Sequence, residues 1–224
     1  MVADLTVSSV AAKYFPAMRN PTDLRQKVLE ASLALIEEGG LDRLSMREVA
    51  RKAGVSHQAP YHYFADREAI LAGIATEGFG MLEQELSHSL DKRVGSQKRA
   101  LEAAARTYVD FALRHPGYFR VMFRSDAVPI ESYPQALDNA DAAFGVLVQA
   151  IDRSFAGEPP EARRNLAFAC WAFTHGLATL LLDGPLARRA GTKKGGQGEL
   201  ADKVIKSFAA HFTTDETRPD RKRL

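Results

Sequence analysis

A short run of polar and aromatic side chains after residue 56 offers the clearest binding chemistry in this sequence. The members that we expect to be exposed are His57, Gln58, Ala59, Tyr61 and His62. A glutamine side chain can hydrogen-bond the edge of adenine, and a tyrosine hydroxyl can donate to a phosphate oxygen. The run is therefore suited to contact with a nucleic acid. An ordinary solvated polar face is the alternative interpretation.

Two helical segments come before this run and can hold it in place. The first follows residues 20–22, carries apolar residues at helical spacing and stops at residues 39–40. The second begins at Ser45, which can bond forward while Glu48 reaches back, in the pattern of a capping box. Gly54 ends the second helix, because glycine readily takes the positive φ of a sharp turn.

A third predicted helix, from Ser56 to about Phe64, carries the polar run. Ser56 can cap it, and Val55 can be buried between the second and third helices. Two short helices joined by a tight turn, with a helix before them to supply a core, form the arrangement that places one helix in the major groove of DNA. The spacing predicts a helix-turn-helix, with an ordinary three-helix cluster as the alternative.

The rest of the chain shows helical periodicity and no alternating strand pattern. Asp66 can cap a fourth helix, in which Gly73, Gly78 and Gly80 indicate close packing, a bend or a compliant joint. Residues 188–198 are basic and glycine-rich, and we expect a loop there. We predict an all-α protein of about nine helices. Its expected parts are a flexible arm at 1–21, a three-helix DNA-binding domain at 22–67, a helical ligand-binding and dimerisation domain at 68–212, and a disordered tail at 213–224.

Composition places the chain among soluble, cytoplasmic proteins. Its 46% hydrophobic content can fill a core, and neither a leader pattern nor an uncharged stretch long enough to span a bilayer is expected. The single cysteine, Cys170, excludes an internal disulfide. Metal ligands are not expected either, because the pairs His57/His62 and Cys170/His175 each lack a third partner. No residue set suggests another cofactor or an enzyme.

Aromatic, histidine and methionine side chains gather in the second predicted domain. They form either a filled core or the lining of an apolar ligand cavity between helices. The residues that we assign to a cavity are Tyr108, Phe111, Phe119, Met122, Phe123, Phe144, Trp171 and His175. Trp171 and His175 lie four residues apart on one helix face, so a structural role for that pair is favoured over ligand contact.

Several stretches of the sequence also form a pattern known from bacterial regulators. Residues 44–50, 53–56, 61–64 and 66–71 read LSMREVA, AGVS, YHYF and DREAIL. In these stretches the sequence resembles the DNA-binding domain of the TetR (TetR/AcrR) family. A weaker similarity lies in WAFTHGL at residues 171–177, which resembles the Trp-His-Gly signature of one C-terminal subtype in that family.

The resemblance implies a transcription regulator, most often a repressor, that acts as a homodimer on a palindromic operator in double-stranded DNA and responds to a small-molecule effector. It also implies phosphate contacts from Ser45, Ser56, Tyr61 and Arg67, the last at a position where the family usually has lysine. The histidines and the glutamine of the polar run would face bases. The full set of expected DNA contacts is Ser45, Arg47, Ser56, His57, Gln58, Ala59, Tyr61, His62 and Arg67.

Pro60 departs from the family pattern, which commonly has a buried aliphatic residue there. Proline lacks an N–H and restrains Ala59, so it fits only within the first turn of a helix. The third helix can therefore begin later than Ser56, which would tilt His57 and Gln58 relative to the groove. Together with the net charge of only +2, this keeps a second hypothesis open, a helical ligand-binding or protein-interaction module that no longer reads DNA.

Overall fold

The computed structural model describes residues 21–91, 97–193 and 195–212. Within these ranges the chain forms nine α-helices and three 3₁₀ helices without any β-strand, so the predicted all-α class is confirmed. The chain divides into two compact units, with the boundary between Ile70 and Leu71. The expected N-terminal arm, up to residue 20, and the expected C-terminal tail lie outside the described residues.

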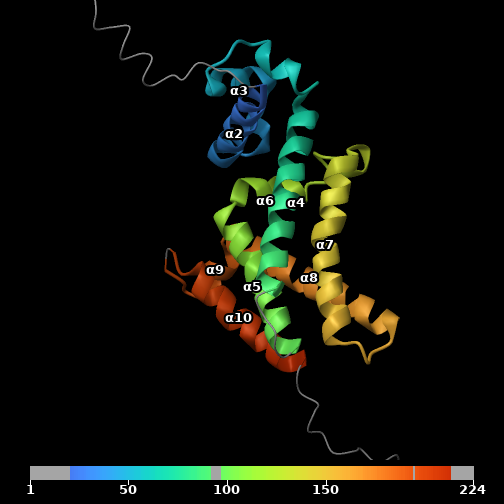
Figure 1. Ribbon diagram of the computed structural model, residues 1–224. Helices are drawn as coiled ribbons and strands as arrows, with labels where there is room; N and C mark the ends of the chain where they lie inside the picture. The colour runs from blue at the N-terminus through green and yellow to red at the C-terminus, as the bar shows by residue number, and fades with distance from the viewer. Residues whose placement is uncertain (1–20, 92–96, 194, 213–224) are drawn as a thin grey trace, which may run out of the picture. The chain divides into compact units, whose positions relative to one another are not determined.

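The N-terminal unit is built from short helices around a small apolar core. Its elements are α2 (Pro21–Gly39), η1 (Leu41–Arg43), α3 (Met46–Ala53), η2 (Ala59–His62) and the beginning of α4 (Arg67–Asp91). Helices α2 and α3 pack against each other (Figure 1), and Val28, Leu29 and Val49 from these helices are fully buried. The first two predicted helices are confirmed, because their apolar spacing matches the face that the fold buries.

The second unit is a helical bundle around α5 (Gln97–Arg114). Helix α5 packs against α6 (Pro116–Met122), α7 (Pro134–Ser154), α8 (Pro160–Leu182) and α10 (Gln197–Phe212), as Figure 1 shows. The remaining elements are η3 (Ile130–Ser132) and α9 (Pro185–Arg189). Val109, Phe111 and Ala112 of α5 are completely buried, which marks this helix as the core of the unit.

The expected loop at residues 188–198 begins too early. Arg188 and Arg189 form the last turn of α9, which starts at Pro185 directly after Gly184. Gly184 takes a φ of 84°, and proline fits the first helical position because its missing N–H would have had no partner in that turn. The Gly-Pro pair is here the start of a short helix. The expected loop also ends too late, because Gln197 and Gly198 belong to the first turn of α10.

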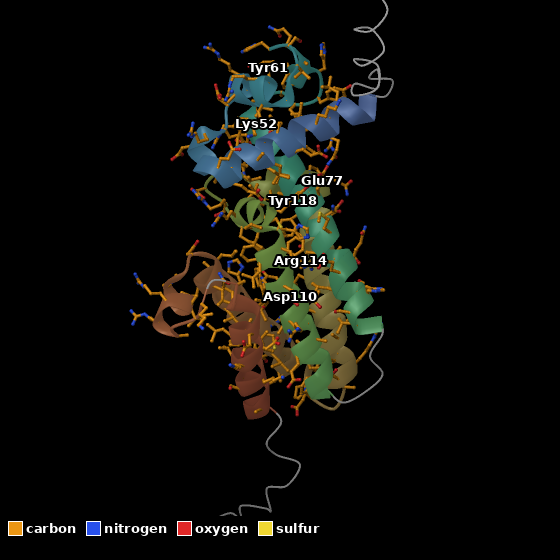
Figure 2. All side chains as sticks on the ribbon, turned by 90° about the vertical axis from the view of Figure 1, so that its left-hand side faces the viewer. Lys52, Tyr61, Glu77, Asp110, Arg114 and Tyr118 are labelled. Atoms are coloured by element: carbon orange, nitrogen blue, oxygen red, sulfur yellow. The ribbon has the colours of Figure 1, made fainter. Side chains whose placement is uncertain are left out.

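Two glycines of α4 allow close packing, one of the roles expected for them. A Cβ atom added at Gly78 would lie 2.6 Å from the sulfur of Met122 in α6, and one at Gly80 would lie 3.2 Å from Asn139 Nδ2 in α7. Beside Gly78, the Tyr118 hydroxyl donates a 3.2 Å hydrogen bond to Glu77, and Figure 2 shows these two labelled side chains next to each other. Helix α4 thus comes close to α6 and α7 at these two positions, where glycine has no side chain.

Helix α8 corrects the expectation that no uncharged stretch of the chain is long enough to span a bilayer. Among the described residues it is the one helix long and apolar enough to cross a bilayer, because its residues 165–182 carry no charged side chain. Core helices of soluble proteins meet the same criterion. Ala167, Leu177, Ala178 and Leu181 are buried on one side of α8, which packs against α5 and α7. Length and composition alone are therefore weak evidence for a membrane span.

Candidate nucleic-acid interface and ligand cavity

The turn after α3 has the geometry that its sequence predicts. Ser45 caps α3, since its hydroxyl accepts a 3.2 Å hydrogen bond from the backbone N–H of Glu48. At the other end Gly54 is left-handed, with φ 67° and ψ 33°. The N–H groups of Gly54 and Val55 bond to the carbonyls of Arg51 and Ala50, which is the double closure of a Schellman motif. Both ends of α3 are therefore fixed by local bonds.

The predicted third helix is much shorter than expected. The structure has only the 3₁₀ helix η2 there, and Gln58, not Ser56, precedes it. An α-helix starting at Ser56 would need an N–H at Pro60 to bond the Ser56 carbonyl, and proline has none. Instead, the N–H of Ala59 donates to the Ser56 carbonyl at 3.0 Å, and the 3₁₀ helix η2 begins at Ala59 with Pro60 in its first turn. Pro60 thus delays the helix, as the sequence suggests.

The side chains expected to contact DNA are exposed, apart from Ala59 and the half-buried Arg67. Ser45, Ser56, His57, Gln58 and His62 are exposed, Tyr61 is 44% exposed, and Figure 2 shows Tyr61 at the surface of its unit. Ala59 is the correction, because it is buried together with Pro60 against the N-terminal unit. Ala59 and Pro60 thus belong to the core of the unit, whereas Gln58, Tyr61 and His62 are exposed.

Basic side chains near the turn differ in how tightly they are held. Arg51 donates from Nε and Nη2 to Oε2 of Glu48 at 3.0 and 2.6 Å. Between Ser45 and Glu48 the described residues show only the forward bond to the Ser45 hydroxyl, which is half of the expected capping box. Lys52, labelled in Figure 2, pairs with Glu38 of α2 and lowers the pKa of that carboxyl group. Arg47 is exposed and makes no ion pair with the part of the chain that the structure describes.

Arg67 is partly exposed and also makes a hydrogen bond within the N-terminal unit. Its Nη2 atom donates a 2.9 Å hydrogen bond to the carbonyl of Leu41, and the side chain is half-buried. Asp66 caps α4 beside it, since Asp66 Oδ1 accepts the N–H of Ala69 at 2.8 Å, as predicted. The guanidinium has five N–H donors, so the bond to Leu41 leaves others for a phosphate. The predicted phosphate contact of Arg67 stays a prediction.

The second unit contains a cavity of about 490 Å³, which lies in the size range of small-molecule sites. Five of the residues assigned to a cavity from the sequence border it: Tyr108, Met122, Phe123, Phe144 and Trp171. Phe111, Phe119 and His175 are not among its lining residues. Phe111 is fully buried and Phe119 is almost fully buried, so both side chains belong to the packed core between the helices.

Several cavity residues could not be found from the aromatic pattern. Phe79, Leu82 and Leu86 of α4 border the cavity, and so do three acidic residues, Glu102, Glu131 and Asp141. The leucines belong to an apolar helical stripe, which predicts burial without telling a cavity wall from a core. The acidic residues lie on polar faces of three separate elements, and no spacing in the sequence connects them.

The Tyr108–His175 pair shows what the Trp-His-Gly run does in the fold. The Tyr108 hydroxyl lies 3.0 Å from Nδ1 of His175, and the imidazole ring packs against Phe119 and Phe123 with centroid distances of 5.3 and 4.6 Å. Trp171, one turn earlier on α8, contacts the Phe144 ring at a centroid distance of 5.5 Å. The histidine thus has the structural role favoured by the sequence, and the tryptophan borders the cavity.

Two family models match the chain, one in each unit. Residues 28–74 match the model of bacterial regulatory proteins of the tetR family, and residues 101–208 match a tetracyclin repressor-like C-terminal domain. The chain belongs to the TetR family. It is therefore a TetR-family regulator with a DNA-binding domain in its N-terminal unit. The Trp-His-Gly subtype itself stays a prediction.

Two curated relatives match this TetR-family chain over less than half of its length. It is 29% identical over 97 residues to the uncharacterized HTH-type transcriptional regulator YobS of Bacillus subtilis (strain 168), covering 43% of this chain and 50% of the relative. It is 34% identical over 70 residues to YvdT, another uncharacterized HTH-type transcriptional regulator of that strain, covering 31% of this chain and 32% of the relative. The matches thus span half and about a third of these relatives.

Solved structures resemble the TetR-family chain over most of its length. A protein with unknown function from Rhodococcus sp. RHA1 shares 29% identity with a TM-score of 0.69, and the match covers 88% of this chain and 96% of that one. The TetR family transcriptional regulator PfmR from Thermus thermophilus shares 19% identity with a TM-score of 0.64, covering 85% and 99%. At that identity the second match shows the fold alone.

Proposed function

We propose that this regulator is a repressor that binds a palindromic operator as a homodimer and leaves the DNA when a small-molecule effector binds. The exposed surface around the Gly54 turn carries the proposal. Arg47 and Tyr61 offer donors for phosphate oxygens there, and His57 and Gln58 offer hydrogen-bonding groups for base edges. Donors of both kinds on one exposed surface are what a groove-binding surface requires.

The operator is tested with DNA from upstream of the protein's own gene. Fluorescence anisotropy at moderate salt should show binding to a palindromic duplex that is at least about a thousandfold tighter than binding to a scrambled duplex of the same composition. Equal affinity for the two duplexes would contradict sequence-specific regulation by this protein in the cytoplasm.

The homodimer is supported by one side of α8. Phe168 and Leu180 are each 47% exposed, and Ala169 and Ala172 lie exposed between them on the same side. Large apolar side chains next to small ones suit close packing against the same face of a second copy. Sedimentation should give a dimer mass at micromolar concentration. Leu180→Glu should give a monomer, and Gln149→Glu on the exposed side of α7 should stay dimeric.

The effector is assigned to the cavity of the second unit. Helix α4 runs from the N-terminal unit into the cavity wall, so a ligand that favours one position of α4 can change which conformations bind DNA. A coupling of about 1–3 kcal/mol is enough for such regulation. An effector should therefore weaken operator binding by a factor of about 5 to 150 and leave the fold intact.

A second candidate function is a helical binding module that no longer reads DNA. It is favoured by the shortness of η2 and by the ion pairs that hold Arg51 and Lys52. The two functions differ in salt dependence, because neutralisation of phosphates makes the logarithm of the binding constant fall linearly with the logarithm of the salt concentration. A steep negative slope supports the repressor, and no DNA binding at low salt supports the module.

A further inference from the structure

The cavity has a lining of one charge sign. Its charged residues among the described side chains are Glu102, Glu131 and Asp141, and neither a lysine, an arginine nor a histidine borders it. Glu102 is half-buried on α5, and Glu131 and Asp141 are exposed on η3 and α7. These three acidic groups would repel a carboxylate or phosphate ligand and would attract a cation.

Aromatic rings border the same cavity close to one of these acidic residues. Phe144 lies one helical turn after Asp141 on α7, so the two side chains are neighbours on one face. The Phe144 ring stacks with Phe168 at a centroid distance of 5.8 Å and contacts Trp171 at 5.5 Å, and all three rings border the cavity. Ring faces attract cations, most strongly when the cation is partly desolvated.

Two of the three hydroxyl groups that border the cavity are already engaged within the protein, and the third belongs to Ser125, which is exposed. Tyr108 bonds His175 at 3.0 Å, and Thr174 donates to the carbonyl of Cys170 at 2.9 Å. The other lining residues are mostly aliphatic or aromatic. The interior therefore suits a hydrocarbon body, and the acidic side chains suit a positive charge at one end of it.

From these observations we propose that the cavity binds an apolar molecule carrying a positively charged nitrogen. The apolar body would lie among the aliphatic side chains, and the nitrogen would lie near Asp141, Glu131 and the Phe144 ring. This proposal rests on the proposed function, in which the cavity is the effector site. It adds the chemical class of the effector and excludes anionic molecules such as fatty acids.

Three probes with the same hydrocarbon chain and different head groups test the proposal. They are decyltrimethylammonium, decanol and decanoate, used with the full-length protein free of DNA. The two ionic probes are kept below their micelle concentrations, and decanol is kept below its solubility limit. Trp171 is the only tryptophan of the chain and borders the cavity, so its fluorescence reports binding directly, and calorimetric titration provides an independent measurement. Decyltrimethylammonium should bind about tenfold tighter than decanol, and decanoate about tenfold weaker.

A charge-neutral variant separates the electrostatic contribution from the apolar one. Asp141→Asn combined with Glu131→Gln should remove most of the preference for the cation and change decanol affinity less than about twofold, because both residues are exposed and decanol carries no charge. Asp138→Asn is the matched control, since Asp138 is exposed on α7 outside the cavity lining, and it should behave as the unmodified protein.

The outcomes distinguish the ligand class from the proposed function. Decanoate binding as tight as decanol binding, an undiminished cation preference in the double variant, or no binding of any probe would overturn the proposal. Operator release is measured separately with the same probes. If the cation binds and the operator stays bound, the ligand class is retained and release by this ligand is refuted.

Discussion

The hydroxyl of Tyr108 on α5 lies 3.0 Å from Nδ1 of His175 on α8, and the bond joins the two helices at the core of the second unit. Burial lowers the pKa of His175, so the imidazole is neutral near pH 7, and in the tautomer with its proton on Nε2 the Nδ1 atom accepts a hydrogen bond from the tyrosine hydroxyl. Burial also raises the pKa of Tyr108, which keeps that proton in place. The pair is thus a neutral hydrogen bond between packed helices.

Removing the Tyr108 hydroxyl should lower stability without removing the fold. Tyr108→Phe keeps the buried ring and leaves His175 Nδ1 without its donor, which should reduce the free energy of unfolding by about 0.5–1.5 kcal/mol. Urea unfolding measures the change. Tyr63→Phe, at a tyrosine that is 36% exposed, is the control and should change stability by less than about 0.5 kcal/mol. Equal effects of the two variants would contradict a stabilising bond.

Acid should destabilise the protein in part through His175. Its pKa is lowered in the folded state, so below the unfolded pKa of about 6.5 the unfolded chain binds a proton that the folded chain does not. This contribution to stability is fully present above that pH and is lost as the pH falls from there toward the folded pKa. In His175→Asn, the loss between pH 7.5 and pH 5.5 should be smaller than in the unmodified protein.

The comparison of slopes cancels the other titrating groups, which both proteins share. Asparagine keeps an acceptor for the Tyr108 hydroxyl and does not titrate, so the variant can retain the bond while losing the pH response. The difference in slope has an upper limit of about 1.4 kcal/mol per pH unit, the value for one proton. Parallel stability curves for the two proteins would refute a role of His175 in the pH response.

Local signals in the sequence predicted the helix ends well. Ser45 and Asp66 cap the helices that they were assigned to, because a cap depends on residues within one turn. Ser56 has the same chemistry but does not cap a helix, since Pro60 prevents the bond that an α-helix would need there. A prediction that a residue caps an α-helix therefore also requires that the residue four positions later is not proline.

Properties that depend on tertiary packing were less predictable. Helical periodicity placed Phe111 and Phe144 alike on apolar faces, yet Phe111 is fully buried and Phe144 borders the cavity. Which face stays uncovered depends on how neighbouring helices pack, and periodicity within one helix contains no such information. The same limit hid Asp141, whose relation to the cavity arises from several helices together.

Substitutions of two helical glycines should have opposite effects on stability. Gly78→Ala places a Cβ atom 2.6 Å from the buried Met122 sulfur and should destabilise the protein by about 1–3 kcal/mol, because overpacking exceeds the gain in helix propensity. Gly145→Ala in α7 meets no atom within 4 Å and should stabilise it by about 0.5–1 kcal/mol. Denaturant midpoints measure both. A stabilising Gly78→Ala would contradict close packing at α4.

Two predicted phosphate contacts, from Tyr61 and from Arg47, should respond differently to salt. Tyr61→Phe removes an uncharged donor, so affinity for operator and scrambled DNA should fall by a similar factor of about 3 to 10, with an unchanged salt slope. Arg47→Gln removes a charge from each protomer, so the slope of log K against log salt concentration should become shallower by about 2 in a dimer.

Arg153→Gln provides the matched control for the salt titration, because Arg153 is an exposed arginine on α7 in the second unit. It removes the same charge from the protein as a whole and should leave the slope unchanged, since the slope counts only phosphates neutralised in the complex. Equal slopes for Arg47→Gln and Arg153→Gln would show that Arg47 does not touch the DNA. If Tyr61→Phe weakened only operator binding, Tyr61 would contact a base edge and not a phosphate.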